Sequence, residues 1–282
     1  MSERWDKAYL KECSVLYEKL CTLLSRLDIR RDAEMILQCI EQVARFARHH
    51  HPGRFADGLL DNKALEIGRH LKEYTFPASG GDTDCPFPSL TRDGSHHVLH
   101  VATTVLVYGG HTRLINNWMK NDTDSCHSLL LIDQHSERVP GWLTDTIKNQ
   151  NGEVMQFPSD APLLQKAQWL RQVVSTGIDL VVLHLHPYDM VPIVAFATQK
   201  CPPVAMMDHA DHLFWIGSSV ADVMINFRES GLSLSRHRRY SRANVLMPLP
   251  MEMPRPVTTR EEARCALELQ EADVMVMSIG SA

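Results

Sequence analysis

The sequence predicts an α/β protein in which a doubly wound parallel sheet follows an all-helical region and precedes the start of a second α/β domain. Three observations support this prediction. Residues 1–76 carry apolar residues at helical spacing, residues 96–247 alternate short apolar runs with segments of helical length, and residues 259–282 begin that alternation again. Alternating strands and helices are typical of a parallel sheet that helices cover on both faces.

The helical region contains three amphipathic segments. Apolar residues recur at three- and four-residue steps over residues 8–27 and again over residues 33–47. The second stripe ends at residues 48–52, Arg-His-His-His-Pro, where cations complement the helix dipole and proline stops the helix. A third helical stretch is expected over residues 62–74. We expect the helices of residues 1–76 to form a bundle that is separate from the sheet.

A linker is expected over residues 77–95, because their prolines and glycines cannot continue a helix. The sheet domain then occupies residues 96–247. Its strands are expected at residues 97–102, 128–132, 153–157, 180–185, 204–207, 223–226 and 244–247. Stretches of helical length separate most of these strands, and residues 162–174 and 230–239 are expected to be helices.

A proline-rich crossover follows at residues 248–258, and residues 259–282 are expected to start the second α/β domain. Thr259 and Glu262 fit the capping box that opens a helix. Residues 273–279 are apolar enough for a buried strand that enters a turn. A buried parallel strand needs neighbours, so we expect this domain to be truncated here and completed by a continuation of the chain.

The composition indicates a globular protein. The chain has 282 residues, 44% of them hydrophobic, which is enough for one large core or two smaller ones. A formal net charge of −5 does not favour a nucleic-acid partner. No apolar run is long enough to span a bilayer, the first residues carry no secretory signal, and the 7 cysteines are scattered singly. We therefore expect a cytoplasmic protein with reduced thiols.

Polar residues follow three of the predicted strands at the points where these strands end. The candidates are Gly109, Gly110, His111, Thr112 and Arg113 after the first strand, His184, His186 and Asp189 around and after the end of the fourth, and Asp208, His209, Asp211 and His212 after the fifth. The carboxyl ends of parallel strands meet at one edge of a sheet, and open α/β sheets bind their ligands there. We expect these residues to face one crevice.

A metal-dependent hydrolase is one interpretation of the histidines. The segment from Met207 to His212 resembles the His-x-His-x-Asp-His signature of metallo-β-lactamase-like hydrolases without its first histidine. His184 and His186 would add ligands of the type that zinc or iron prefers. The layered antiparallel architecture of that family conflicts with the alternation of strands and helices in this sequence.

A second resemblance covers more of the chain. The glycine turn at residues 109–113, the strand ending in residues 207–209, the segment 210–217 and the proline-rich crossover resemble, in order and spacing, the N-terminal half of a GT-B glycosyltransferase. The likeness is to retaining enzymes of the GT4 type, and it spans residues 96–282. It implies a Rossmann-like acceptor-side domain that is followed by a donor-binding domain.

The resemblance also implies roles for the candidate residues. Gly109 and Gly110 would form the loop that faces the donor diphosphate, with residues 111–113 bordering the same space. His209 would lie near the transferred sugar as the catalytic residue, and Asp208 would fix its tautomer. The reaction would use a nucleotide-sugar as its donor substrate and an unknown acceptor, retain the anomeric configuration, and need no cofactor and no metal.

A non-catalytic binding or scaffolding module is the remaining interpretation. In that case the helical region recruits a protein partner or associates with a second copy. Metal analysis distinguishes the hydrolase from the other two classes. Continuation of the chain into a second α/β domain distinguishes the glycosyltransferase from the scaffold.

Overall fold

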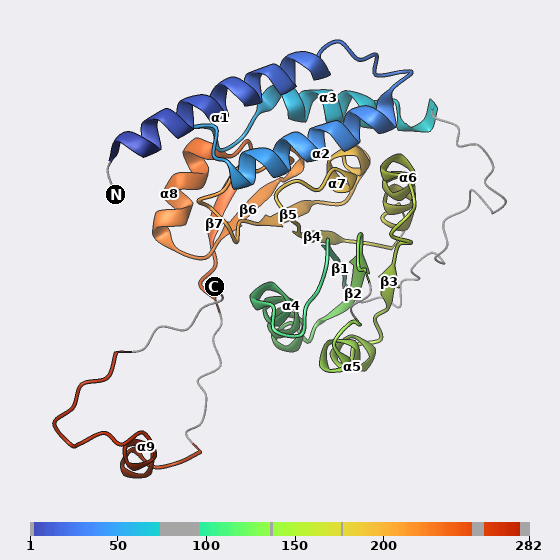
Figure 1. Ribbon diagram of the computed structural model, residues 1–282. Coiled ribbons are helices and arrows are strands. Elements are labelled where there is room, and N and C mark those ends of the chain that lie inside the picture. The colour runs from blue at the N-terminus through green and yellow to red at the C-terminus, as the bar shows by residue number, and fades with distance from the viewer. Residues whose placement is uncertain (1–2, 74–95, 136–137, 176, 250–256, 277–282) are drawn as a thin grey trace. The chain divides into compact units, whose positions relative to one another are not determined.

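The computed structural model describes residues 3–73, 96–135, 138–175, 177–249 and 257–276, and the chain divides into two compact units, Met1–Leu249 and Pro250–Ala282. In the first unit, a 7-stranded sheet has the strand order β3-β2-β1-β4-β5-β6-β7 (Figure 1). Every neighbouring pair is parallel. The predicted α/β class with a doubly wound parallel sheet is confirmed.

All seven predicted strands are present. They are β1 (His96–Ala102), β2 (Ser125–Leu131), β3 (Val154–Gln156), β4 (Leu180–His184), β5 (Val204–Met207), β6 (Val223–Asn226) and β7 (Ala243–Leu246). β2 begins earlier than expected, because Ser125, Cys126 and His127 pair with the first residues of β1. The chain moves outward from β1 to β3 and then returns to place β4 beside β1, so the strand order reverses there. A crevice forms at such a reversal.

The helices largely follow the predicted segments. They are α1 (Glu3–Leu24), α2 (Ala33–His49), α3 (Gly58–Arg69), α4 (Gly110–Asn121), α5 (Gly141–Asn149), α6 (Leu163–Val173), α7 (Val191–Ala195), α8 (Glu229–Arg238) and, in the second unit, α9 (Arg260–Ala266). α3 begins before the predicted residue 62, because Asp57 caps it by accepting from the Leu59 and Leu60 amides at 2.9 and 3.3 Å. No helix in the described ranges is long and apolar enough to cross a membrane.

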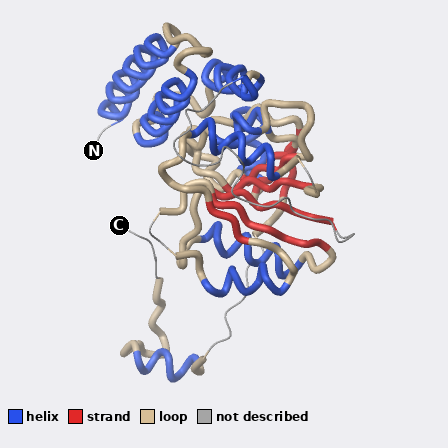
Figure 2. Tube along the Cα trace, turned by 90° about the vertical axis from the view of Figure 1, so that its right-hand side faces the viewer, coloured by secondary structure: helices blue, strands red, loops and turns tan. Residues whose placement is uncertain are grey.

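Helices cover both faces of the sheet (Figure 2). On one face, Ile115 and Met119 of α4 and Ile147 of α5 pack against Leu129 and Leu131 of β2. On the other face, α6 and α7 lie next to the strands, and α1, α2 and α3 lie outside them. Alternate residues of each strand therefore enter different cores, as the two-residue period of a strand requires.

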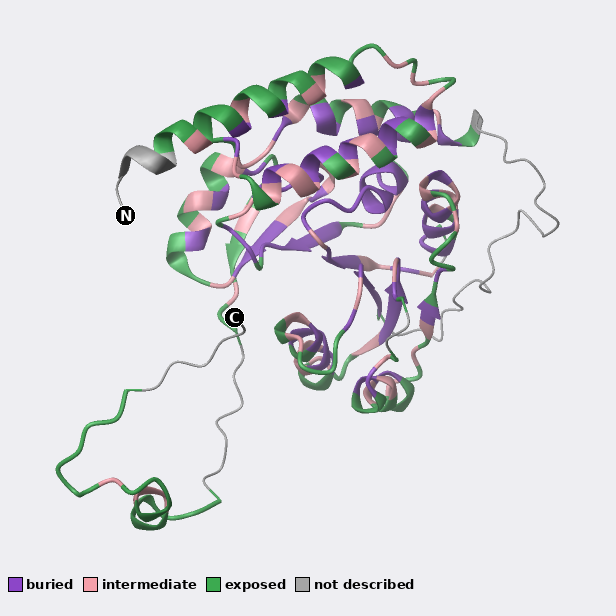
Figure 3. Ribbon diagram, in the orientation of Figure 1, coloured by how far each residue is buried: buried purple, intermediate pink, exposed green. Residues whose placement is uncertain are grey.

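The helical region is not the separate bundle that we expected. Its apolar residues, including Ile36 and Ile40 of α2, belong to the same core as Leu99 and Val181 of the sheet, and α1 exposes only its outer side (Figure 3). Polar contacts join the layers as well: Arg171 of α6 donates to the backbone carbonyls of Gly68, Val194 and Ala195 at 2.9, 2.7 and 2.8 Å. The amphipathic stripes of α2 and α3 therefore cover the α6 and α7 layer as well as packing on neighbouring helices of their own region.

Glu34 of α2 is a second link between these layers. Its carboxylate accepts from the Leu163 and Leu164 amides at the start of α6, both at 2.9 Å. A carboxylate there satisfies free N–H groups and interacts favourably with the helix dipole. The helical region therefore completes an element of the sheet domain.

The second unit contains α9 with the predicted capping box. The Thr259 hydroxyl accepts from the Glu262 amide at 3.2 Å, and the Glu262 carboxylate accepts from the Thr259 amide at 2.8 Å. The strand expected at residues 273–279 is absent from its described part, residues 273–276, where Val274 is 89% exposed. A strand needs a paired neighbour, and this segment pairs with none of the described residues. Residues 277–279, the linker at 77–95 and crossover residues 250–256 lie outside the described residues.

Candidate functional site

Two histidines meet above the carboxyl edge of the sheet. His111 comes from the first turn of α4, His209 follows β5, and their rings stack with centroids 6.2 Å apart and planes inclined by 25°. The rings of His209 and Trp215 also form a T-shaped pair, with centroids 5.2 Å apart. The strand ends thus bring together residues that are far apart in the sequence, as the sequence analysis expected.

The His111 ring is held by a backbone group. His111 Nε2 lies 2.8 Å from the Thr104 carbonyl oxygen, which only accepts, so Nε2 carries the proton and donates. The Met207 backbone lies near the His209 ring and favours its protonated form. A neutral imidazole that donates from one nitrogen carries a lone pair on the other. The pair can therefore accept hydrogen bonds from a ligand.

His186 joins this histidine group from the loop after β4. Its Nδ1 lies 3.1 Å from the Tyr188 hydroxyl and its Nε2 lies 3.5 Å from the Thr104 hydroxyl. Burial, followed by the positive charge that His111 would carry, lowers the pKa of His186 to about 4. The same two causes lower the pKa of His209 to about 4, although part of this residue is open to solvent. His186 and His209 are therefore neutral at pH 7.

The glycine pair opens α4. Gly109 is the N-cap residue with φ of −73°, and neither glycine has a positive φ. A Cβ on Gly109 would lie 2.9 Å from the Thr112 hydroxyl, whereas a Cβ on Gly110 would meet nothing within 4 Å. Local packing thus explains a glycine at position 109. Packing does not explain the glycine at position 110, which faces open space at a helix N-terminus.

Thr112 does not border the crevice as expected. Its buried hydroxyl accepts from the Leu106 amide at 3.0 Å and fixes the turn before α4. Arg113, in contrast, is exposed on α4. These two neighbours point in different directions because adjacent positions of a helix do not share a face.

His184 is buried beneath the histidine group. Its Nε2 contacts His100 Nδ1 at 3.0 Å, and burial, followed by His111 and His209, lowers its pKa to about 3. His184 and His186 therefore contact different parts of the protein. Among the described residues no three His, Cys, Asp or Glu side chains are placed to hold a metal ion, so the hydrolase interpretation has no supporting geometry.

Asp208 does not orient His209 as expected. Its Oδ2 accepts from the Ser235 hydroxyl at 2.7 Å and pairs with Arg239 Nε at 3.2 Å, and the side chains of Asp208 and Arg239 are both 1% exposed. His212 is exposed and lies 3.7 Å from Asp211, whose carboxylate pairs with Arg228 at 2.7 Å. The structure thus assigns Asp208 to the packing of α8, and His212 contacts Asp211 instead of His111 or His209.

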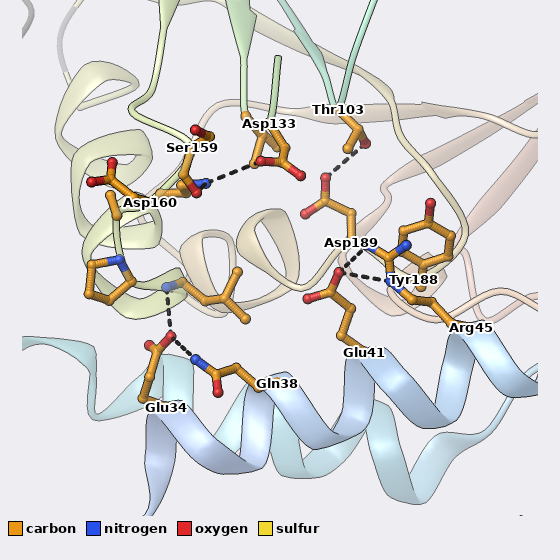
Figure 4. A pocket seen from close by; sticks show the side chains of 15 residues that line it. Glu34, Gln38, Glu41, Arg45, Thr103, Asp133, Ser159, Asp160, Tyr188 and Asp189 are labelled. Atoms are coloured by element: carbon orange, nitrogen blue, oxygen red, sulfur yellow. Dashed lines mark hydrogen bonds and ion pairs between the residues drawn. The ribbon is translucent and has the colours of Figure 1, made fainter. Parts of the chain in front are cut away.

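A pocket of about 380 Å³ lies at the same edge of the sheet, between strand ends, α2 and α6 (Figure 4). Its lining carboxylates are Glu34, Glu41, Asp133, Asp160 and Asp189, and its lining cations are Arg45 and Lys166. Asp189 is buried and accepts from the Thr103 hydroxyl at 2.8 Å, and burial raises its pKa to about 7. Of these charged residues the strand-end pattern of the sequence includes only Asp189, because α2 contributes one wall of the pocket.

The pocket and the histidine group share the end of β1. The Thr103 hydroxyl accepts from the His186 amide at 2.8 Å and donates to Asp189 on the pocket side. The next residue, Thr104, holds His111. A ligand that spans the two sites would therefore contact side chains that two consecutive threonines position.

No protein-family model and no curated protein matches the chain. Among solved structures it is similar to an O-GlcNAc transferase mutant from Thermobaculum terrenum, at 14% identity and a TM-score of 0.40, over 84% of this chain and 42% of that one. It is also similar to eIF2B beta from Chaetomium thermophilum, at 7% identity and a TM-score of 0.31, over 82% of this chain and 85% of that one. Likeness at these levels concerns the α/β fold alone. The chain spans less than half of the transferase.

Proposed function

We propose that this chain is the acceptor-side part of a glycosyltransferase that moves a sugar from a nucleotide donor to an acceptor hydroxyl. One observation supports this most directly: His111, His186 and His209 gather next to the open N-terminus of α4 at the carboxyl edge of the sheet. The resemblance of the sequence to GT-B glycosyltransferases supports the same class. A purely scaffolding protein would not require three clustered histidines at this edge of the sheet.

The hydrogen-bonding capacity of the histidines fits a sugar. His111 donates to backbone from Nε2, which leaves Nδ1 of that ring for a ligand, and the neutral His209 ring carries a lone pair on one nitrogen. Sugar hydroxyls are hydrogen-bond donors that can satisfy such lone pairs. The low pKa values of His186 and His209 keep both rings uncharged at pH 7.

The start of α4 fits the donor diphosphate. This helix has 12 residues, and its first amides and its dipole attract anions. A Cβ at Gly110 would meet nothing within 4 Å, so an oxyanion can approach the backbone without meeting a side chain. In this proposal the remaining donor contacts come from a donor-binding domain, of which residues 259–282 would be the start.

The chemical step then has a simple form. The acceptor hydroxyl, lying in the crevice beside Asp189, attacks the anomeric carbon and loses its proton to a neutral histidine ring there, while the bond from that carbon to the diphosphate oxygen breaks. The dipole of α4 stabilises the negative charge of the departing diphosphate. His209 hydrogen-bonds a hydroxyl of the transferred sugar. By resemblance, the anomeric configuration is retained and no metal is required.

Two substitutions test this proposal in the full protein with its donor domain. His209→Ala should lower kcat more than it weakens nucleotide binding, because the lost contact strengthens in the transition state. Loss of one such hydrogen bond costs about 1–3 kcal/mol, roughly tenfold to a hundredfold in rate. Gly110→Val should weaken donor use without unfolding the protein, since its side chain enters open space.

Gly141→Val is the matched control for Gly110→Val. Gly141 also occupies the first position of a helix, α5, and a Cβ there would likewise meet nothing within 4 Å. The assay is release of nucleoside diphosphate from a panel of UDP- and GDP-linked hexoses, with thermal unfolding measured in parallel. Parental rates in both site variants, at unchanged stability, would contradict this placement of the active crevice.

A scaffolding role through the helical region is the alternative that one observation favours. α1 exposes apolar side chains on its outer side, with Leu16 46% and Leu23 57% exposed. We propose that this side receives a protein partner or a second copy of the chain. Leu16→Glu with Leu23→Glu should then reduce association in analytical ultracentrifugation, and an unchanged sedimentation profile would remove the support for it.

A further inference from the structure

Three buried histidines form a continuous row across the sheet, on the face that α4 covers. His127 of β2 contacts His100 of β1 through Nδ1 and Nε2 at 3.1 Å, and His100 Nδ1 contacts His184 Nε2 at 3.0 Å. Their exposed fractions are 0%, 0% and 2%. The rings of His100 and Trp118 of α4 pack in a T-shaped arrangement with centroids 5.6 Å apart. The row is therefore sealed from solvent along its length.

The register of the strands makes this row diagonal. His127 lies opposite Val98, two positions before His100, and His184 lies opposite Ala102, two positions after it. Each step thus crosses one strand and advances by one inward-facing position toward the carboxyl edge. β2, β1 and β4 are neighbours in Figure 1. The row connects the loop before β2 with the floor of the histidine group.

One end of the row fixes the direction of every hydrogen bond. His127 Nε2 lies 3.2 Å from the Asp122 carbonyl oxygen and 3.3 Å from its carboxylate, and both only accept. His127 must therefore donate from Nε2 and accept at Nδ1. By the same logic His100 donates from Nε2, and so does His184. The series ends with a lone pair on His184 Nδ1.

That terminal nitrogen is the unexplained atom of the row. His184 Nδ1 is buried and has no hydrogen-bond partner among the described residues. Buried polar atoms are nearly always paired, so an orphan acceptor indicates a donor that binds from elsewhere. His184 is the last residue of β4, so it lies at the carboxyl edge of the sheet where His111 and His209 meet. The free lone pair is thus next to the crevice where the proposed function places the reacting groups.

We propose that this row is a proton relay from the crevice to Asp122. A hydroxyl or water in the crevice loses its proton to His184 Nδ1, and the Nε2 proton of His184 moves to His100 Nδ1. The Nε2 proton of His100 moves to His127 Nδ1, and that of His127 moves to the Asp122 carboxylate. One O–H bond breaks, one carboxyl O–H bond forms, and all three imidazoles exchange tautomers while remaining neutral.

The burial of the row explains why the proton passes through it. Desolvation lowers the pKa of His100, His127 and His184, so a cation is unfavourable at each of them, although Asp122 acts in the opposite direction at His127. The Asp122 side chain is 33% exposed, so it can release the proton to water. The relay rests on the proposed function only for the identity of the group that supplies the proton.

The donor-to-acceptor direction of the hydrogen bonds in the row is tested first, without any substrate. Nitrogen NMR of ¹⁵N-histidine-labelled protein at pH 7 distinguishes protonated from unprotonated ring nitrogens. We expect protons on Nε2 and lone pairs on Nδ1 in His100, His127 and His184. A protonated Nδ1 on His184 would overturn the proposal, whatever the enzyme activity proves to be.

Asp122→Asn then tests transport. The backbone carbonyl of residue 122 still accepts from His127, so the tautomers should be unchanged while the proton acceptor is lost. We expect slower exchange of the His100 and His184 Nε2 protons with water, at unchanged exchange of the β1 and β4 backbone amides. Asp124→Asn, in the same loop and exposed, is the control and should leave ring exchange at the parental rate. Equal ring exchange in both variants would overturn the relay.

The catalytic consequence is measured separately. With an active donor, Asp122→Asn should lower kcat on the order of a hundredfold, the scale of a positioned proton transfer, and Asp122→Glu should restore part of it. Parental turnover in Asp122→Asn would overturn the relay but leave the glycosyltransferase standing. No turnover with any nucleotide sugar, together with slowed ring exchange, would support the relay and count against the proposed function.

Discussion

Removing the Asp208 carboxylate should destabilise the fold instead of disabling a catalytic group. Asp208 pairs with Arg239 Nε at 3.2 Å inside the protein. The guanidinium also donates to the carbonyls of Phe55 and Leu213 at 2.7 and 3.2 Å, so it joins the end of α8 to two loops. Asp208→Ala leaves this charge buried with neutral partners only.

The stability that Asp208→Ala should lose follows from the uncompensated charge of Arg239. Removing one partner of a buried ion pair costs about 3–5 kcal/mol, out of the roughly 5–15 kcal/mol by which domains of this kind are stable. Replacing both partners, as Asp208→Leu with Arg239→Met, removes the charge and should recover most of the loss. With the single variants Asp208→Leu and Arg239→Met added, the double-mutant cycle yields the coupling energy of the pair.

Urea unfolding at pH 7 measures these free energies, with Arg242→Gln as the control. Arg242 pairs with Asp222 at 3.0 Å, but its side chain is 84% exposed, so its loss should cost about 1 kcal/mol or less. If Asp208→Ala also changes stability by less than about 1 kcal/mol, the structural role fails. A loss of sugar transfer at unchanged stability would return Asp208 to the active site.

Two further predictions concern the helical region and the pocket. Glu34→Ala should destabilise the protein by about 1–2 kcal/mol in urea, since α6 loses its cap; no change would mean that α2 contributes no cap. Burial raises the pKa of Asp189 to about 7, so the folded state keeps a proton between about pH 4 and 7 that the unfolded state releases, and stability falls as pH rises. The free energy of unfolding of Asp189→Asn should therefore rise relative to that of the parent across that window, by up to about 4 kcal/mol. A pH-independent difference would show that Asp189 is ionised throughout.

The sequence by itself determined the fold class and the edge of the sheet where the candidate histidines gather. Strands of a parallel sheet are buried on both faces, so they read as continuous apolar runs, and all seven runs became strands. The parallel direction brings their carboxyl ends together, which is why His111 and His209 are neighbours although they lie in distant parts of the chain. These features depend on local periodicity, which one sequence displays.

The tertiary structure decided which partner each polar side chain has. Asp208 and His209 are adjacent in sequence, yet one pairs with Arg239 and the other stacks on His111. The apolar run at residues 273–276 forms no strand, because strand formation depends on a neighbour and not on composition alone.

The histidine row shows the physical reason for this division. His127, His100 and His184 carry no common motif, and they meet only because the register of β1 with β2 and β4 sets them two positions apart. Register is fixed by the packing of whole faces against helices, which is a sum over many distant contacts. Local sequence patterns predict the strands, whereas only the assembled sheet brings His127, His100 and His184 into contact.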